Sequence, residues 1–346
     1  MDKNAIHTVA FSPDDRLVRS ASSANVKVWD TTDSSVRYRL LMEQSCPVVS
    51  ISPDGKLLAV QYWKHVEIYD SITGNLLKTI YQHSPWVSPY VKSTRFLPDC
   101  SSIAIALDAS LDLWDLSPEF EQVTGSELDR VSGVTISRDG TFGASSSLDF
   151  NTTVKIWDTA KEVVIHDLIV EPGRVQGLRL SPDERLLLSL AGDGSLMLWD
   201  TGTGRKACTL RPQCQSGSLL AFMEAIIFSP DSQILSSSWV DLEPERPKEL
   251  PIYLWNTNTG ELIHVLQYPL ELECRPVVFS PDGKIVATAA RSHNGGDSRV
   301  LLWCTESGSL IYDVENKGSF PWLEFSADGK ILAYAVEHGV ELCHLG

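Results

Sequence analysis

Short runs of alternating apolar and polar residues follow one another along the chain, separated by turn-forming residues. In residues 277–283, an apolar Val-Val-Phe run leads into Ser-Pro-Asp-Gly. Proline presets φ, aspartate can accept a hydrogen bond from the backbone that follows it, and glycine tolerates positive φ, so this tetrapeptide predicts a tight turn. Runs such as 285–289 and 261–266 have the composition of strands. The pattern predicts an all-β chain, in which only residues 118–130 suggest a helical turn.

The turn sequence recurs in phase, which predicts a repeat architecture. Ser-Pro-Asp-Gly occurs at residues 52–55 and 280–283, and variants of it begin at Ser12, Leu97, Ser137, Ser181, Ser229 and Ser326. Each copy is followed by a run that ends in Trp-Asp or a variant, beginning at Trp29, Tyr69, Trp114, Trp157, Trp199, Trp255, Trp303 and Cys343. A Thr-Gly or Ser-Gly pair often comes next, as at 203–204 and 307–308. Four short strands per period of about 40–50 residues are typical of a propeller blade.

These motifs resemble those of the WD-repeat β-propeller family over nearly the whole chain and, more loosely, the propellers attached to fungal NACHT-type NTPases. The resemblance implies one propeller over residues 1–346, with eight four-stranded antiparallel blades that begin near residues 6, 46, 91, 131, 175, 223, 275 and 320. The closing blade is expected to have three strands, because residues 1–5 are too few to supply a fourth; the alternative is that this chain belongs to a longer one. An open edge there would permit self-association.

The sequence departs from the family pattern at the Gly-His pair that usually precedes each blade. The histidine of that pair normally bonds an aspartate, and here only Asp149 and Asp193 occupy the aspartate position, while Asn25, His65 and His338 lie near it in other units. We therefore expect the buried Asp–His network to be broken, and the blades to be held by packing of the repeat's tryptophans.

Charge and composition exclude several classes of function. Lys+Arg number 29 and Asp+Glu number 45, which gives a net charge of −16. This excess argues against nucleic acid and anionic membranes as partners, because both attract basic surfaces. The seven cysteines form no C-x-x-C pair, which favours reduced thiols and an intracellular, cytoplasmic location. The spacing of histidines, glycines and carboxylates predicts no metal, cofactor or catalytic residue.

Three long segments, 211–224, 239–251 and 291–299, are predicted to lie on one face of neighbouring blades. Their side chains include the aromatic, methionine and arginine types that are enriched at interfaces, namely Phe222, Met223, Trp239, Arg246, Leu250, Arg291 and His293. Simple solvated insertions, with Trp239 folded back onto its blade, are the alternative. Gly295 and Gly296 could suggest a phosphate cradle, but no P-loop lysine follows them.

The expected function is a non-catalytic scaffold for protein–protein interaction, since strands can hold variable loops on one rigid face. One alternative is the sensor or ligand-binding portion of a larger signalling NTPase. A further alternative is an enzyme with its site at the central channel, because propellers also host catalysis.

Overall fold

A computed structural model gives the fold. It describes residues 6–345 except for 13–15, 23–24, 34, 42–47, 63, 82–90, 98–99, 108–109, 117–121, 128–130, 148–152, 160, 162, 172, 213–218, 222, 242–247, 250, 269–271, 293–297, 317–322 and 337–338. The chain divides into two compact units, which are considered separately below. The first comprises residues 1–46, 193–195 and 208–346, and the second comprises residues 47–192 and 196–207.

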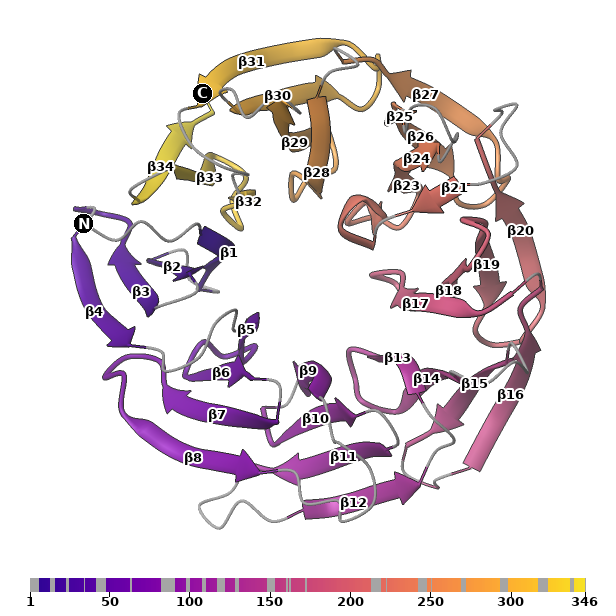
Figure 1. The fold of residues 1–346 in the computed structure, drawn as a ribbon, viewed down its shortest axis with the longest axis horizontal. Coiled ribbons are helices and arrows are strands. Elements are labelled where there is room, and N and C mark those ends of the chain that lie inside the picture. The colour runs from indigo at the N-terminus through magenta and orange to yellow at the C-terminus, as the bar shows by residue number, and fades with distance from the viewer. Residues whose placement is uncertain are drawn as a thin grey trace. The chain divides into compact units, whose positions relative to one another are not determined.

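The second unit contains four four-stranded antiparallel sheets, each formed by consecutive strands (Figure 1). Two of them are β5 (Val48–Ile51), β6 (Leu57–Gln61), β7 (His65–Asp70), β8 (Leu76–Tyr81); and β9 (Val91–Phe96), β10 (Ser102–Leu107), β11 (Ser110–Asp115), β12 (Gln122–Glu127). The others are β13 (Val131–Ile136), β14 (Phe142–Ser147), β15 (Thr153–Asp158), β16 (Val163–Ile169); and β17 (Val175–Leu180), β18 (Leu186–Ala191), β19 (Leu196–Asp200), β20 (Lys206–Leu210), whose last three residues belong to the first unit.

The first unit contains three four-stranded sheets and two three-stranded ones. The four-stranded sheets are β1 (Ile6–Phe11), β2 (Leu17–Ser22), β3 (Asn25–Asp30), β4 (Val36–Leu41); β22 (Ile227–Phe228), β23 (Ile234–Ser237), β26 (Ile252–Asn256), β27 (Leu262–Leu266); and β28 (Leu272–Phe279), β29 (Ile285–Ser292), β30 (Ser298–Cys304), β31 (Leu310–Asn316). The last repeat forms β32 (Leu323–Phe325), β33 (Ile331–Val336) and β34 (Gly339–His344), and an inserted sheet consists of β21 (Leu219–Ala221), β24 (Trp239–Asp241) and β25 (Lys248–Glu249), with the 3-10 helix η1 (Met223–Ala225) beside it in sequence.

The expected helical turn within 118–130 is wrong. Residues 122–127 form β12, which pairs antiparallel with β11, Leu113 opposite Thr124. Pairing along a neighbouring strand satisfies the backbone of this polar segment better than an isolated turn of helix, which is costly to nucleate.

A buried serine organises the turn between the first two strands of most repeats. Ser280 Oγ donates a hydrogen bond to Asp282 Oδ1 at 2.7 Å and accepts one from the backbone N–H of Ile285 at 2.9 Å. The same pair of bonds recurs around Ser52, Ser137, Ser181, Ser229 and Ser326. Hydrogen bonds from the Ser280 hydroxyl and the Lys284 amide hold the pKa of Asp282 below its ordinary value.

The turn that follows Trp-Asp lies at the same end of the sheet, and a hydroxyl joins the two turns. Thr305 Oγ1 donates to the carbonyl of Gly283 at 2.8 Å. Thr257 and Thr201 make the equivalent bonds to Ser232 and Glu184. This end of each sheet is therefore fixed by bonds that the repeat encodes.

Four tryptophans of the Trp-Asp motif bond a serine on the neighbouring strand. Trp199 Nε1 donates to Ser189 Oγ at 2.8 Å, and the pairs Trp29–Ser20, Trp157–Ser145 and Trp255–Ser237 are alike, at 2.9, 2.8 and 2.7 Å. In the third sheet, Ile105 occupies the place of the serine, opposite Asp112. The buried Nε1 of Trp114 therefore has no partner among the described residues. The expectation that packing alone holds the blades is thus incomplete, because the indole–hydroxyl bond remains.

Fourth strands contact the turn of the sheet that follows. In the first unit, the His264 ring lies under Gly308 (φ 66°), where an added Cβ would come within 2.9 Å of the imidazole. His264 Nε2 is also 2.9 Å from the carbonyl oxygen of Glu306. In the second unit, His166 lies in the same way under Gly204, 3.0 Å from the carbonyl oxygen of Gly202.

Replacing Gly308 with alanine should destabilise the protein more than replacing Gly283. Both glycines have positive φ, which costs an alanine about 1 kcal/mol, but the Gly283 site is open, with its nearest contact at 3.9 Å. Only Gly308→Ala adds a clash with His264. Urea unfolding should show the difference, and in a His264→Ala background the two substitutions should cost about the same. An equal cost in the wild-type background would contradict the contact.

Removing the Ser189 hydroxyl should destabilise its sheet. Ser189→Ala leaves the Trp199 indole N–H buried without an acceptor, which costs about 1–3 kcal/mol. Ser189→Thr is the matched control, because it retains the hydroxyl, and Thr288 holds the equivalent place in the seventh sheet, opposite Leu301 as Ser189 is opposite Met197. Thermal unfolding should separate the two variants, and equal melting temperatures would disprove a contribution from this bond.

Candidate partner-binding face

The connection between β23 and β26 is folded, not a simple loop as expected for residues 239–251. β24 pairs antiparallel with β21, Ala221 opposite Trp239, and also with β25, Val240 opposite Glu249. The segment 211–224 likewise contributes β21 and η1. Two of the three long segments therefore meet in one inserted sheet, at the end of the sixth repeat opposite its two hydrogen-bonded turns.

Trp239 anchors this sheet from inside. Its side chain is 0% exposed, and its Nε1 donates to the carbonyl oxygen of Gly194 at 2.7 Å. Its ring meets those of Tyr253 and Trp255 edge-on, with centroids 5.5 and 6.2 Å away. The prediction that Trp239 is a surface contact for a partner is wrong; it folds back onto its own repeat.

Polar contacts surround the carbonyl that Trp239 binds. Asp193 accepts hydrogen bonds from the amide and hydroxyl of Ser195, both at 2.9 Å, and Arg211 Nη1 lies 3.3 Å from its second oxygen. Asp193 occupies the place where family members bond a histidine, and here Ser195 and Arg211 satisfy it. The segment that begins at Arg211 is thereby tied to the same turn as Trp239.

The structure describes only part of the remaining predicted face. Met223 lies in η1 and is partly buried, and the backbone of Arg291 lies in β29, opposite Glu273 and Ser298. The third expected loop is correspondingly shorter, because residues 291–292 and 298–299 belong to strands. Phe222, Arg246, Leu250 and His293 fall outside the described residues.

One cluster of titratable groups lies elsewhere, in the second repeat. Tyr69 stands at the tryptophan position and donates through its hydroxyl to Glu67 Oε2 at 2.6 Å. The rings of Tyr62 and His65 stack at 4.4 Å, and His65 Nε2 is 3.7 Å from Glu67 Oε1. Burial, reinforced by Glu67, raises the pKa of Tyr62, so its phenol stays neutral. The cluster serves as a substitute for the indole–serine bond.

Neither a cluster of metal ligands nor a membrane-spanning helix occurs in the described part of the chain. No group of three or more His, Cys, Asp or Glu side chains there could hold a metal ion. No helix in that part has the length and apolar character needed to cross a membrane.

The repeats match a known family model. The model for "WD domain, G-beta repeat" matches residues 2–30, 120–158 and 165–200. Each match ends at the residue after a motif tryptophan, at Asp30, Asp158 and Asp200. The chain contains WD repeats. Eight of its described sheets correspond to the blades of a WD-repeat β-propeller, seven of them four-stranded and the last three-stranded, and the inserted sheet is additional to them.

Relatives and a solved structure agree with this assignment. The chain is 33% identical over 117 residues to cilia- and flagella-associated protein 52 of Chlamydomonas reinhardtii, 24% over 311 residues to apoptotic protease-activating factor 1 of Rattus norvegicus, and 22% over 300 residues to guanine nucleotide-binding protein subunit beta of Oryza sativa. These alignments cover 32%, 89% and 84% of this WD-repeat chain but only 19%, 22% and 63% of the relatives.

The crystal structure of the computationally designed Ika8 protein has the same fold. It matches this WD-repeat chain with a TM-score of 0.76 at 19% identity, covering 99% of this chain and 97% of that one.

Substituting Trp239 with phenylalanine should loosen the inserted sheet. The variant keeps an aromatic ring but loses the bond to Gly194, at a cost of about 1–3 kcal/mol. Hydrogen exchange of the amides in β21 and β24 should become faster. Trp157→Phe, which loses the bond to Ser145 in the other unit, is the control and should leave those amides unchanged. Unchanged exchange in Trp239→Phe would show that the bond does not anchor the sheet.

Proposed function

We propose that this WD-repeat protein is a non-catalytic platform for protein–protein interaction. Its partner would bind the face that carries the inserted sheet of the sixth repeat. The observation that carries the proposal is the anchoring of that sheet by the fully buried Trp239 to Gly194. A sheet that is folded and fixed in this way loses little conformational entropy when a partner binds to it, which favours binding.

The two ends of the sixth blade differ in a way that supports this choice. One end consists of repeat-encoded turns, in which Ser229 bonds Asp231 and Thr257 bonds the carbonyl of Ser232. Substitutions there would disturb the fold. The other end carries the insertion, whose sequence the repeat does not constrain, and can vary with the partner.

Proteins are the proposed partners, in preference to nucleic acid or anionic membranes, because the chain's net charge is −16. We propose an intracellular location because the seven cysteines of the sequence form no C-x-x-C pair, a pattern that favours reduced thiols. Among the described cysteines, Cys208, Cys304 and Cys343 carry free thiols.

The decisive comparison uses two variants of the sixth blade. In the first, residues 242–247 are replaced by Gly-Gly, which joins β24 to β25 by a short turn and leaves Trp239 in place. In the second, the exposed Glu261 at the opposite end becomes lysine. Proteins recovered with the wild type and quantified by mass spectrometry should be lost with the first variant and retained with the second.

Both variants should melt at the wild-type temperature, since both keep Trp239 and the other buried contacts of the described residues. Recovery that survives the shortened insertion and fails with Glu261→Lys would place the binding face at the other end and refute the proposal.

A second candidate is a regulatory portion of a larger signalling protein. It is favoured by the 311-residue similarity to apoptotic protease-activating factor 1, of which this chain spans 22%. The test is the mass of the endogenous protein detected by an antibody against this chain. A band near 38.2 kDa would reject this candidate, and a much larger band would support it.

A further inference from the structure

The third sheet, which consists of β9 to β12, lacks two hydrogen bonds that tie together the strands of other sheets. Its turn has Leu97 where the seven other repeats have a serine, so no hydroxyl joins this turn to the start of β10. Ile105 stands where four other sheets have the serine that accepts a bond from the motif tryptophan. The buried indole N–H of Trp114 therefore has no acceptor among the described residues, which weakens the attachment of β11 to β10.

The fourth strand of this sheet also lacks an apolar anchor. In other sheets, an aliphatic residue of the fourth strand stands opposite a buried residue near the start of the third strand and is itself at most 3% exposed, as are Ile80, Leu168 and Leu266. In β12 this place is held by Ser126, opposite Leu111, and the preceding residue is Gly125. Serine offers little apolar surface, and glycine weakens a strand interior. β12 therefore depends on backbone pairing with β11 more than these other fourth strands depend on theirs.

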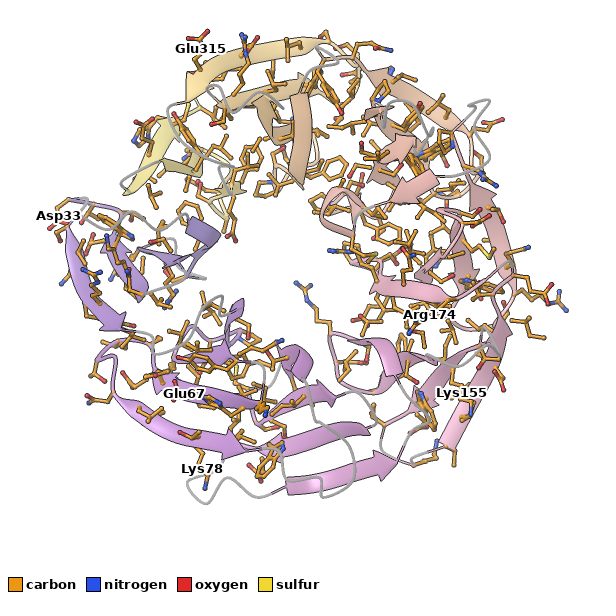
Figure 2. The ribbon with its side chains drawn as sticks, viewed as in Figure 1. Asp33, Glu67, Lys78, Lys155, Arg174 and Glu315 are labelled. Atoms are coloured by element: carbon orange, nitrogen blue, oxygen red, sulfur yellow. The ribbon has the colours of Figure 1, made fainter. Side chains whose placement is uncertain are left out.

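The fourth sheet, in the same unit, has the ties that the third sheet lacks. Its turn serine, Ser137, and its acceptor serine, Ser145, make the bonds described above. Lys155 stands opposite Asp167, and its Nζ lies 5.8 Å from the ring centre of Trp157. Figure 2 shows Lys155 at the outer strands of this sheet. The third sheet has no lysine at this place, so the two sheets form a matched pair in which only the fourth is fully tied.

The inner strands of the third sheet are, by contrast, firmly packed. Phe96 of β9 and Ile103 and Ile105 of β10 are at most 5% exposed, and they share an apolar cluster with Ile68 of the second sheet. Among the described side chains of β11, Trp114 packs against this cluster and is only partly buried. Apolar burial thus holds β9 and β10 in place, and the weak boundary of the sheet lies between β10 and β11.

We propose that β11 (Ser110–Asp115) and β12 (Gln122–Glu127) form a flap, which opens from β10 and closes on it again while the rest of the second unit stays folded. Opening frees the backbone edge of β10 and uncovers Ile103 and Ile105. The population of the open state sets how often this apolar surface can be reached. The flap belongs to the second unit and the inserted sheet to the first, so either proposal can fail without the other.

Native-state hydrogen exchange of the full chain at increasing urea concentrations tests the flap directly. The amides that pair β11 with β12 should exchange at least about tenfold faster than the equivalent amides of β15 and β16. They should share one dependence on urea, because the two strands open together, while amides that pair β9 with β10 stay protected. Equal protection of the two pairs of strands would overturn the proposal, and so would exchange of β9 and β10 in the same step as β11 and β12.

Two reciprocal substitutions test the missing anchor. Ser126→Leu supplies the aliphatic residue and should slow the exchange of β11 and β12 at least about tenfold. Leu168→Ser makes the opposite change in the fourth sheet and should speed the exchange of β15 and β16 while leaving β11 and β12 as they are. Unchanged exchange of β11 and β12 in Ser126→Leu would overturn the proposal.

A second matched pair tests the unpartnered indole. Trp114→Phe and Trp157→Phe remove similar amounts of aromatic surface, but only Trp157→Phe breaks a hydrogen bond, the one to Ser145. The exchange of β15 should therefore increase in Trp157→Phe by at least about tenfold more than the exchange of β11 increases in Trp114→Phe. Equal increases would show that Trp114 is tied as firmly as Trp157, which contradicts the flap.

Discussion

A single buried hydroxyl in the first turn of every repeat but the third fixes the geometry from which the rest of the sheet is built. Ser280 donates to Asp282 and accepts from the amide of Ile285, so one side chain joins the turn to the start of the second strand. That strand sets the register of the third, and the register places Ser189 opposite Met197, two residues before Trp199, within reach of its indole N–H. Because the hydroxyl is buried, each of its hydrogen bonds is electrostatically stronger than it would be in water.

This arrangement separates stability from function along each sheet. The end with the serine turn is joined by threonine to the turn after Trp-Asp, as Thr305 is to Gly283, and leaves little room for variation. The opposite end has no such constraint and carries the inserted sheet in the sixth repeat.

The sequence predicted best what is encoded within a few consecutive residues. Ser-Pro-Asp-Gly and Trp-Asp each specify a turn locally, so the strands and the all-β class could be derived from them. The Ser189–Trp199 bond was missed because it depends on the pairing of two strands. The burial of Trp239 was left as one of two alternatives, because its partner, Gly194, lies 45 residues away. A helical turn was expected within residues 118–130, but residues 122–127 form a strand, because pairing of β12 with β11 overrides the local preference for a turn.

Native-state hydrogen exchange of one set of equivalent amides tests the central role of the turn hydroxyl most directly. The amides of Leu57, Phe142, Leu186, Ile234, Ile285 and Ile331 donate to turn serines. Ser102 is the equivalent residue in the third repeat, where Leu97 replaces the serine and offers no hydroxyl. The account predicts that the Ser102 amide exchanges faster than the other six. Equal protection at Ser102 would contradict it.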